Sequence, residues 1–292
     1  MRMLAEALRH EVLLADAAIE ERLRTLRLDV ERDLFGAPSC FAVLNLTRWH
    51  TLRELYKDQL RAGADIVRTN TSQASPLELK RFGLEEDAFA INYAAAQIAA
   101  DAVDAVPGGD RRRFVLGIVR DLGWDATSRE IEEATALQAS ALLAGGVDGI
   151  ALAVASDACR GPALLEGARS AREEANSAAG IFIWQDGRER SQALRRFSDG
   201  VIRHRQVTSS AQIPGDTNLI SGTRPEDTAL LDQVLRSIAE NSARPPIATC
   251  KSPEAAFFSP MPRRSSVQKS RGRSPSPTAN VIYCASRWAQ RR

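Results

Sequence analysis

A cluster of small polar side chains follows an apolar segment in the first third of the chain. The segment AGADIVRTNTSQAS, residues 62–75, passes from apolar residues into Thr69, Asn70 and Thr71. Hydroxyl and amide groups at the end of a buried strand suit a small polar ligand, because parallel sheets place their ligand sites at the carboxyl ends of strands. The same groups also suit local backbone bonds and capping of a helix that should open near Pro76. The spacing alone leaves both interpretations open.

Other catalytic signatures are missing from the sequence. It contains no GxxxxGK[ST], no HExxH, no GxSxG and no GxGxxG between a strand and a helix. Its three histidines are dispersed, which gives a Ser-His-Asp arrangement little support. The four cysteines form no CxxC pair, so neither a disulfide framework nor a zinc ribbon is indicated; they are Cys40, Cys159, Cys250 and Cys284.

Apolar strands alternate with amphipathic helical segments over residues 1–242. Helices are expected at 51–62, 85–104 and 127–144, and each is followed by a continuous apolar run. Continuous runs are typical of parallel strands that are covered on both faces. The pattern predicts an α/β protein with a parallel sheet, in which TNTSQAS lies where a barrel places its substrate loop.

The segment NLTRWHTLRELYKDQLRAGADIVRTNTSQASPLELKRFGLEED, residues 45–87, resembles the homocysteine S-methyltransferase family. That family has the same order of an N-L-T loop, a helix, A-G-A-D-I and then T-N-T. Four further stretches are similar in the same order along the chain, namely 13–23, 114–119, 142–157 and 217–238.

The resemblance implies a (β/α)₈ TIM barrel that activates homocysteine with a zinc ion held by three cysteines. Zinc-bound thiols are deprotonated, and three thiolates leave a fourth position for the substrate sulfur. The resemblance also implies a substrate-binding role for Asp16, Thr69, Asn70 and Thr71.

This sequence departs from the family at the metal site. The stretch from Leu219 to Pro225 reads LISGTRP and lacks the family's Cys pair, and no cysteine lies between Cys159 and Cys250. The family's I-E-T is Leu152-Ala153-Val154 here, which removes a carboxylate expected to bind the homocysteine amino group. We therefore expect no metal and no other cofactor, and no catalytic residue is assigned.

The barrel is also expected to be short. Residues 154–217 supply 64 residues where one helix and three full units need about 110. One or more βα units must be missing, with plausible strands only at 180–184 and 200–207. A shortened barrel would leave strand edges exposed unless something covers them.

The last fifty residues differ in composition from the rest. Residues 251–292 carry nine Lys or Arg and one Glu, which gives +8 against −6 for residues 1–250. We predict a shortened barrel over 1–242 and a disordered, basic, Pro/Ser/Arg-rich tail over 243–292. The tail has few aromatic residues for base stacking, so nucleic acid is an unfavoured partner. The chain has no long apolar run, which predicts a cytoplasmic protein without a membrane partner.

Two functions follow from the sequence. The first is methyl transfer to homocysteine or another small thiol, in methionine synthesis, as the resemblance implies. The second is a catalytically inactive relative that acts as a binding or vestigial protein, because the metal ligands and the carboxylate are absent.

Overall fold

The computed structural model describes a barrel and parts of the segments that follow it. The described residues are 3–17, 19–106, 108, 111–123, 125–154, 160–186, 198–206, 217–221, 227–228 and 231–232. The predicted tail, 243–292, lies outside them, so its disorder and the boundary at 242 stay predictions.

Seven parallel strands form one sheet in the described part of the chain, in the order β1-β7-β6-β5-β4-β3-β2. A parallel bridge between Ala15 and Ile66 joins the end of β1 to β2, so the two edges of the sheet meet. The Asp16 backbone N–H donates to the Ile66 carbonyl at 2.9 Å at this seam. The strands are β1 Leu13–Leu14, β2 Ile66–Arg68, β3 Phe114–Arg120, β4 Gly149–Ala153, β5 Gly180–Asp186, β6 Gly200–Gln206 and β7 Leu219–Ser221.

The seven strands confirm the α/β TIM-barrel-derived fold and its shortening. The two strands expected near 180–184 and 200–207 are β5 and β6. The expected exposed edge is closed instead, because β1 pairs with β7 on one side and bridges β2 on the other. The ring therefore closes almost completely without an eighth strand among the described residues.

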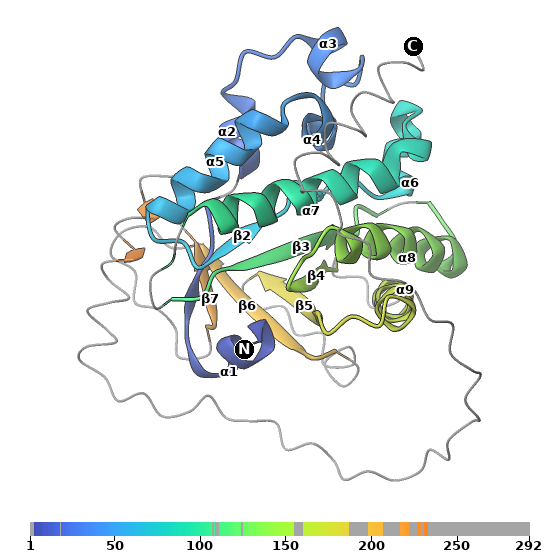
Figure 1. Ribbon diagram of the computed structural model, residues 1–292. Coiled ribbons are helices and arrows are strands. Elements are labelled where there is room, and N and C mark those ends of the chain that lie inside the picture. Colours follow the sequence, from blue (N-terminus) through green and yellow to red (C-terminus); the bar gives the residue numbers. More distant parts are fainter. Residues whose placement is uncertain are drawn as a thin grey trace, which may run out of the picture.

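Helices surround the first part of the barrel. Figure 1 shows α5, α7, α8 and α9 following one another along the outer side of the sheet, while α1 lies at its lower end. The α-helices are α1 Leu4–His10, α2 Ile19–Arg24, α3 Val30–Leu34, α4 Leu44–Thr47, α5 Trp49–Arg61, α6 Pro76–Leu79, α7 Ala88–Ala105, α8 Ser128–Ala144 and α9 Gly161–Glu174. The described residues also form three short 3₁₀ turns, η1 Phe41–Val43, η2 Lys80–Phe82 and η3 Glu85–Asp87.

The helix boundaries follow from local chemistry. The Thr127 hydroxyl accepts from the Glu130 backbone N–H, and the Glu130 carboxylate accepts from the Thr127 backbone N–H, which makes a capping box at the start of α8. After α8 the chain turns into β4 through Gly146, whose φ of +94° suits glycine. The three predicted helices are α5, α7 and α8, each within a few residues of its expected bounds.

The barrel interior is apolar near the amino ends of the strands. Ile66, Phe114, Phe182 and Leu219 belong to one buried cluster, and α1 closes the lower end with Leu4. Glycines make room for the Phe182 ring, because a Cβ built on residue 180 would lie 2.5 Å from that ring. A second cluster packs the outer face of the sheet against α5, α7, α8 and α9. These two apolar layers support the carboxyl ends of the strands.

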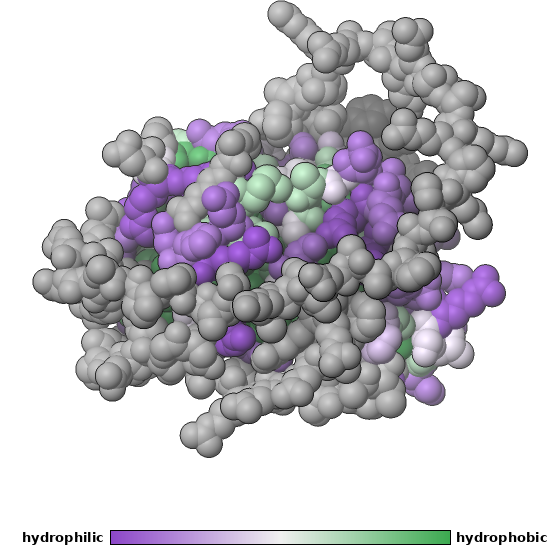
Figure 2. Space-filling view, turned by 90° about the horizontal axis from the view of Figure 1, so that it is seen from below, coloured by the Kyte–Doolittle hydropathy of each residue, from purple (hydrophilic) through white to green (hydrophobic). Residues whose placement is uncertain are grey.

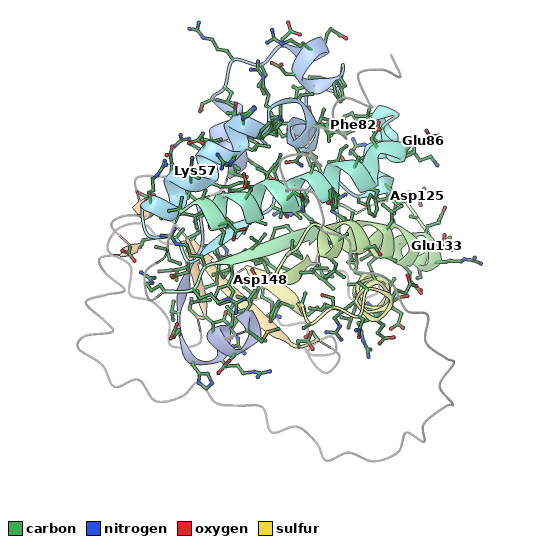
Figure 3. All side chains as sticks on the ribbon, viewed as in Figure 1. Lys57, Phe82, Glu86, Asp125, Glu133 and Asp148 are labelled. Atoms are coloured by element: carbon green, nitrogen blue, oxygen red, sulfur yellow. The ribbon has the colours of Figure 1, made fainter. Side chains whose placement is uncertain are left out.

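The described surface is polar and mixed. On the face in Figure 2, hydrophilic and hydrophobic residues are interspersed among the coloured atoms. Glu133 on α8 points away from the barrel, and its side chain is 63% exposed (Figure 3). Among the described helices, none combines the length and apolar character needed to span a membrane.

Candidate functional site

A cavity of about 410 Å³ opens at the carboxyl ends of the strands. Every strand of the ring contributes to its wall, or the residues just after it do. The wall residues that stand on strands β2 to β7 are Arg68, Ile118, Arg120, Ala153, Trp184, His204, Gln206 and Ser221. The parallel arrangement brings together side chains that are far apart in sequence.

Strand alternation explains why these side chains face the cavity. Successive residues of a strand point to opposite faces, so residues two apart share the barrel interior. His204 follows the buried interior residue Ile202 by two positions, and Ser221 follows Leu219 in the same way. The interior thus changes from an apolar layer to a polar layer as the strands approach their carboxyl ends.

Asp16 and Arg68 form a buried ion pair beside the seam of the barrel. Arg68 Nε lies 2.9 Å from Asp16 Oδ1, and the Arg68 backbone N–H donates to the same oxygen at 3.1 Å. The side chain of Asp16 is 1% exposed and that of Arg68 15% exposed. Burial raises the pKa of Asp16, and the Arg68 guanidinium opposes that rise. The pair joins the ends of β1 and β2 and places both charges in the cavity wall.

Thr69, Asn70 and Thr71 follow β2, and their side chains form hydrogen bonds mainly with neighbouring strands and loops of the barrel. Thr71 Oγ1 donates to the Ile118 carbonyl at 2.7 Å, and the Ile118 backbone N–H donates to Thr69 Oγ1 at 3.1 Å. The Asn70 amide donates to the Phe41 carbonyl at 2.8 Å. Thr69 and Asn70 also line the cavity, whereas Thr71 is fully buried. Substrate binding by these residues stays a prediction.

Helix α6 begins at Pro76, as expected, but no side chain of the preceding loop caps it. Pro76 occupies the first turn of α6, and Ser75 at the N-cap makes no side-chain capping bond. The three polar residues after β2 therefore bond the neighbouring strand and loop and do not cap α6.

His204 and Ser221 meet on the opposite wall. His204 Nε2 lies 2.8 Å from Ser221 Oγ, and the His204 ring packs 4.6 Å from the Trp184 ring between centroids. The Arg68 guanidinium lies 5.8 Å from the centroid of the Trp184 ring. Sequence reasoning missed this pair, because it treated the histidines as dispersed and found little support for a Ser-His arrangement. The signal was the alternation that directs both side chains into the barrel.

The residues of the cavity do not fit a thiolate zinc site. The described residues of its wall include no cysteine, and the strand-end positions on β6 and β7 carry a histidine and a serine. Cys40 is buried in a separate apolar cluster, where burial raises the pKa of its thiol to about 11. The other three cysteines lie outside the described residues, and within those residues no three His, Cys, Asp or Glu side chains form a metal-binding group.

A ring of parallel strands, outer helices and a polar cavity at the carboxyl ends of the strands together define a TIM-barrel protein with its site in the usual place. The sequence profile described as Homocysteine S-methyltransferase matches residues 13–246. The chain therefore belongs to the homocysteine S-methyltransferase family.

Two curated relatives are methionine synthases. The protein from Mycobacterium leprae (strain TN) is 26% identical over 186 residues, which cover 62% of this chain and 15% of that protein. The protein from Mycobacterium tuberculosis (strain ATCC 25618 / H37Rv) is 27% identical over 185 residues, covering 61% and 15%. The chain thus spans a small part of the length of these relatives.

Solved structures of the homocysteine methyltransferase MmuM from Escherichia coli have the same fold. The metallated form aligns with a TM-score of 0.56 at 17% identity, over 77% of this chain and 97% of that one. The oxidized form gives a TM-score of 0.55 at 18% identity. At this level of identity the likeness extends to the fold alone.

Proposed function

We propose that this protein binds homocysteine, or another small amino-acid thiol, in the cavity and transfers a methyl group to its sulfur. The observation that carries the proposal is the cavity of about 410 Å³ at the carboxyl ends of all seven strands, in a chain of the homocysteine S-methyltransferase family. The methionine synthases among its relatives support methionine synthesis as the setting.

The charges of the cavity suit an amino acid. Two carboxylates, Asp16 and Glu20, and two guanidiniums, Arg68 and Arg120, line it among the described residues. An amino acid carries one charge of each sign, so its head group finds complementary partners on the wall formed by β1, β2 and β3. In this proposal Asp16, Thr69 and Asn70 bind the polar head group, and Thr71 positions Thr69. The thiol then points toward β6 and β7.

A calorimetric titration of the full chain with homocysteine tests the binding step. We expect a dissociation constant roughly in the millimolar range, as a few hydrogen bonds provide. Ala153→Phe should weaken binding at least about tenfold, because the ring occupies the cavity without removing a hydrogen bond. Ala178→Phe, at an exposed position before β5, is the matched control and should bind like the wild type.

The outcomes separate the two functions. Equal binding by both phenylalanine variants, or no binding by the wild type, contradicts the proposed site. Binding that never leads to methionine with sulfonium, quaternary ammonium or methylcorrinoid donors supports an inactive binding protein instead.

A further inference from the structure

A proton acceptor for the thiol is required if this cavity methylates sulfur. A free thiol has a pKa of about 8.5 and is mainly protonated at neutral pH, whereas the thiolate is the nucleophile. The described residues on the wall do not fit the thiolate zinc site that would otherwise remove the proton. A group in the cavity that accepts this proton would raise the fraction of thiolate on the bound substrate.

We propose that His204, held by Ser221 and Trp184, accepts the proton of the substrate thiol. The inference rests on the proposed function. His204 is 9% exposed and Ser221 1% exposed, and both line the cavity. The Nε2–Oγ distance of 2.8 Å fixes the ring edge, and the Trp184 ring 4.6 Å away fixes the ring plane. A base held in this way needs little reorganisation when the thiol arrives.

The other titratable groups of the cavity are less suited to the task. Asp16 Oδ1 already accepts hydrogen bonds from the backbone N–H and the Nε atom of Arg68. The reference pKa of a carboxyl group lies about four units below that of a thiol, and the reference pKa of an imidazole lies only about two units below it. Among the described groups of the cavity, His204 is therefore the best matched acceptor.

The proton transfer is balanced without a further reactant. The S–H bond of the substrate breaks, its proton forms an N–H bond at Nε2 directly or through Ser221 Oγ, and a thiolate and an imidazolium result. In water the pKa difference disfavours this pair about 100-fold. The guanidiniums of Arg68 and Arg120 favour the thiolate, and the carboxylates of Asp16 and Glu20 favour the imidazolium. The neighbouring strands contribute the uncharged Trp184 and Ser221.

The test follows thiolate formation on the bound substrate. Homocysteine is added to the full chain over a pH series, and the ultraviolet absorbance of the thiolate gives the midpoint. We expect the wild-type midpoint at least about one pH unit below that of free homocysteine. His204→Gln keeps a hydrogen-bonding group but cannot take the proton, so its midpoint should move most of the way back toward that of the free thiol. Ser221→Ala should move the midpoint in the same direction by less.

Matched controls and a second variant keep the outcomes distinct. His50→Gln removes an exposed histidine that stacks on Trp49, and Ser128→Ala removes an exposed hydroxyl on α8; both should behave like the wild type. If His204→Gln does not fold, Ser221→Ala carries the test. A wild-type midpoint equal to that of free homocysteine, or an unchanged midpoint in both variants, overturns the role of His204 while binding persists. Absence of binding in the wild type overturns the proposed function as well.

Discussion

The two halves of the barrel differ in how their strands are connected and in what their side chains face. After β2, β3 and β4 the chain forms the long helices α7, α8 and α9, which bury the outer face of the sheet. Between β5 and β6, and between β6 and β7, only residues 187–199 and 207–218 are available. Parallel strands need crossovers of about a dozen residues, so these connections are near the minimum.

The polar side chains follow the same division. On the first half, Thr69 and Thr71 bond the backbone of β3, and Asp16 binds Arg68. On the second half, His204 and Ser221 bond each other at the cavity surface. We therefore propose that the first half stabilises the barrel and binds the substrate head group, and that the shortened half supplies the proton acceptor.

The largest effect is expected from breaking the first half at its seam. Asp16→Ala leaves the Arg68 guanidinium without its buried partner, and loss of one partner of a buried pair costs about 3 to 5 kcal/mol of unfolding free energy. Urea denaturation measures it. Asp58→Ala on α5 breaks an exposed pair with Arg61, and there the loss should be at most about 1 kcal/mol. Equal losses in the two variants would show that the seam does not stabilise the barrel.

Homocysteine binding should depend on Asn70, which lines the cavity in the loop after β2. Asn70→Ala removes an amide that lines the cavity and should weaken homocysteine binding by about tenfold, as loss of roughly one hydrogen bond does. Asn92→Ala removes a buried amide that bonds the Ala74 carbonyl at 2.7 Å outside the cavity. It should lower stability and leave the affinity unchanged. Unchanged affinity in Asn70→Ala would show that the head group of homocysteine does not bind at this wall.

Acid should weaken the first half through Asp33. Hydrogen bonds from Arg32 and Arg48 hold the pKa of this buried carboxyl well below its ordinary value. Because the folded pKa is the lower one, the stabilisation is complete above the unfolded pKa of about 4 and is lost as the pH falls below it. The urea concentration at the unfolding midpoint of the wild type should therefore decrease when the pH is lowered below about 4.

Two variants isolate this contribution. Asp33→Asn should be less stable at neutral pH and should lose less of its urea midpoint on acidification. Asp58→Asn, at an exposed carboxylate, should follow the wild type. Parallel acid curves for Asp33→Asn and the wild type would assign the acid sensitivity to other groups.

The smallest effect is expected beyond the barrel. Leu231 packs with Leu14 and Ile220, and Asp232 pairs with Arg111 at 2.5 Å, so the chain still contacts the barrel at residue 232. From the composition of the tail we predict that limited trypsin digestion leaves a fragment ending near residues 244–251 with an unchanged melting temperature. Resistance at Arg263 and Arg273, or a melting temperature lower by several degrees, would place the tail on the barrel.

Local patterns in the sequence predicted much of the fold. The apolar runs and helix ends predicted β3, β4, α5, α7 and α8, because periodicity and glycine signals act within one element. The closure of the ring of seven strands was not predictable in this way. The bridge joins Ala15 to Ile66, and helices α2 to α5 lie between these two residues in the sequence.

The candidate site was predicted in part. The polar residues after β2 stand out in sequence because they are adjacent. The contact between His204 and Ser221 depends on the register of β6 with β7, in which His204 is paired with Leu219. Strand alternation predicts that each side chain faces the interior, but register across a loop is set by tertiary packing, so no local signal shows that the two side chains meet.

The formation of methionine by metal-depleted protein tests the central claim most directly. The full chain, treated with a chelator, is incubated with homocysteine and with sulfonium, quaternary ammonium or methylcorrinoid donors, and methionine is measured by mass spectrometry. We expect slow formation of methionine with at least one donor, retained in Ala178→Phe and lost in Ala153→Phe. Methionine formation that appears only after one equivalent of zinc is restored, or none from any donor while homocysteine still binds, would contradict it.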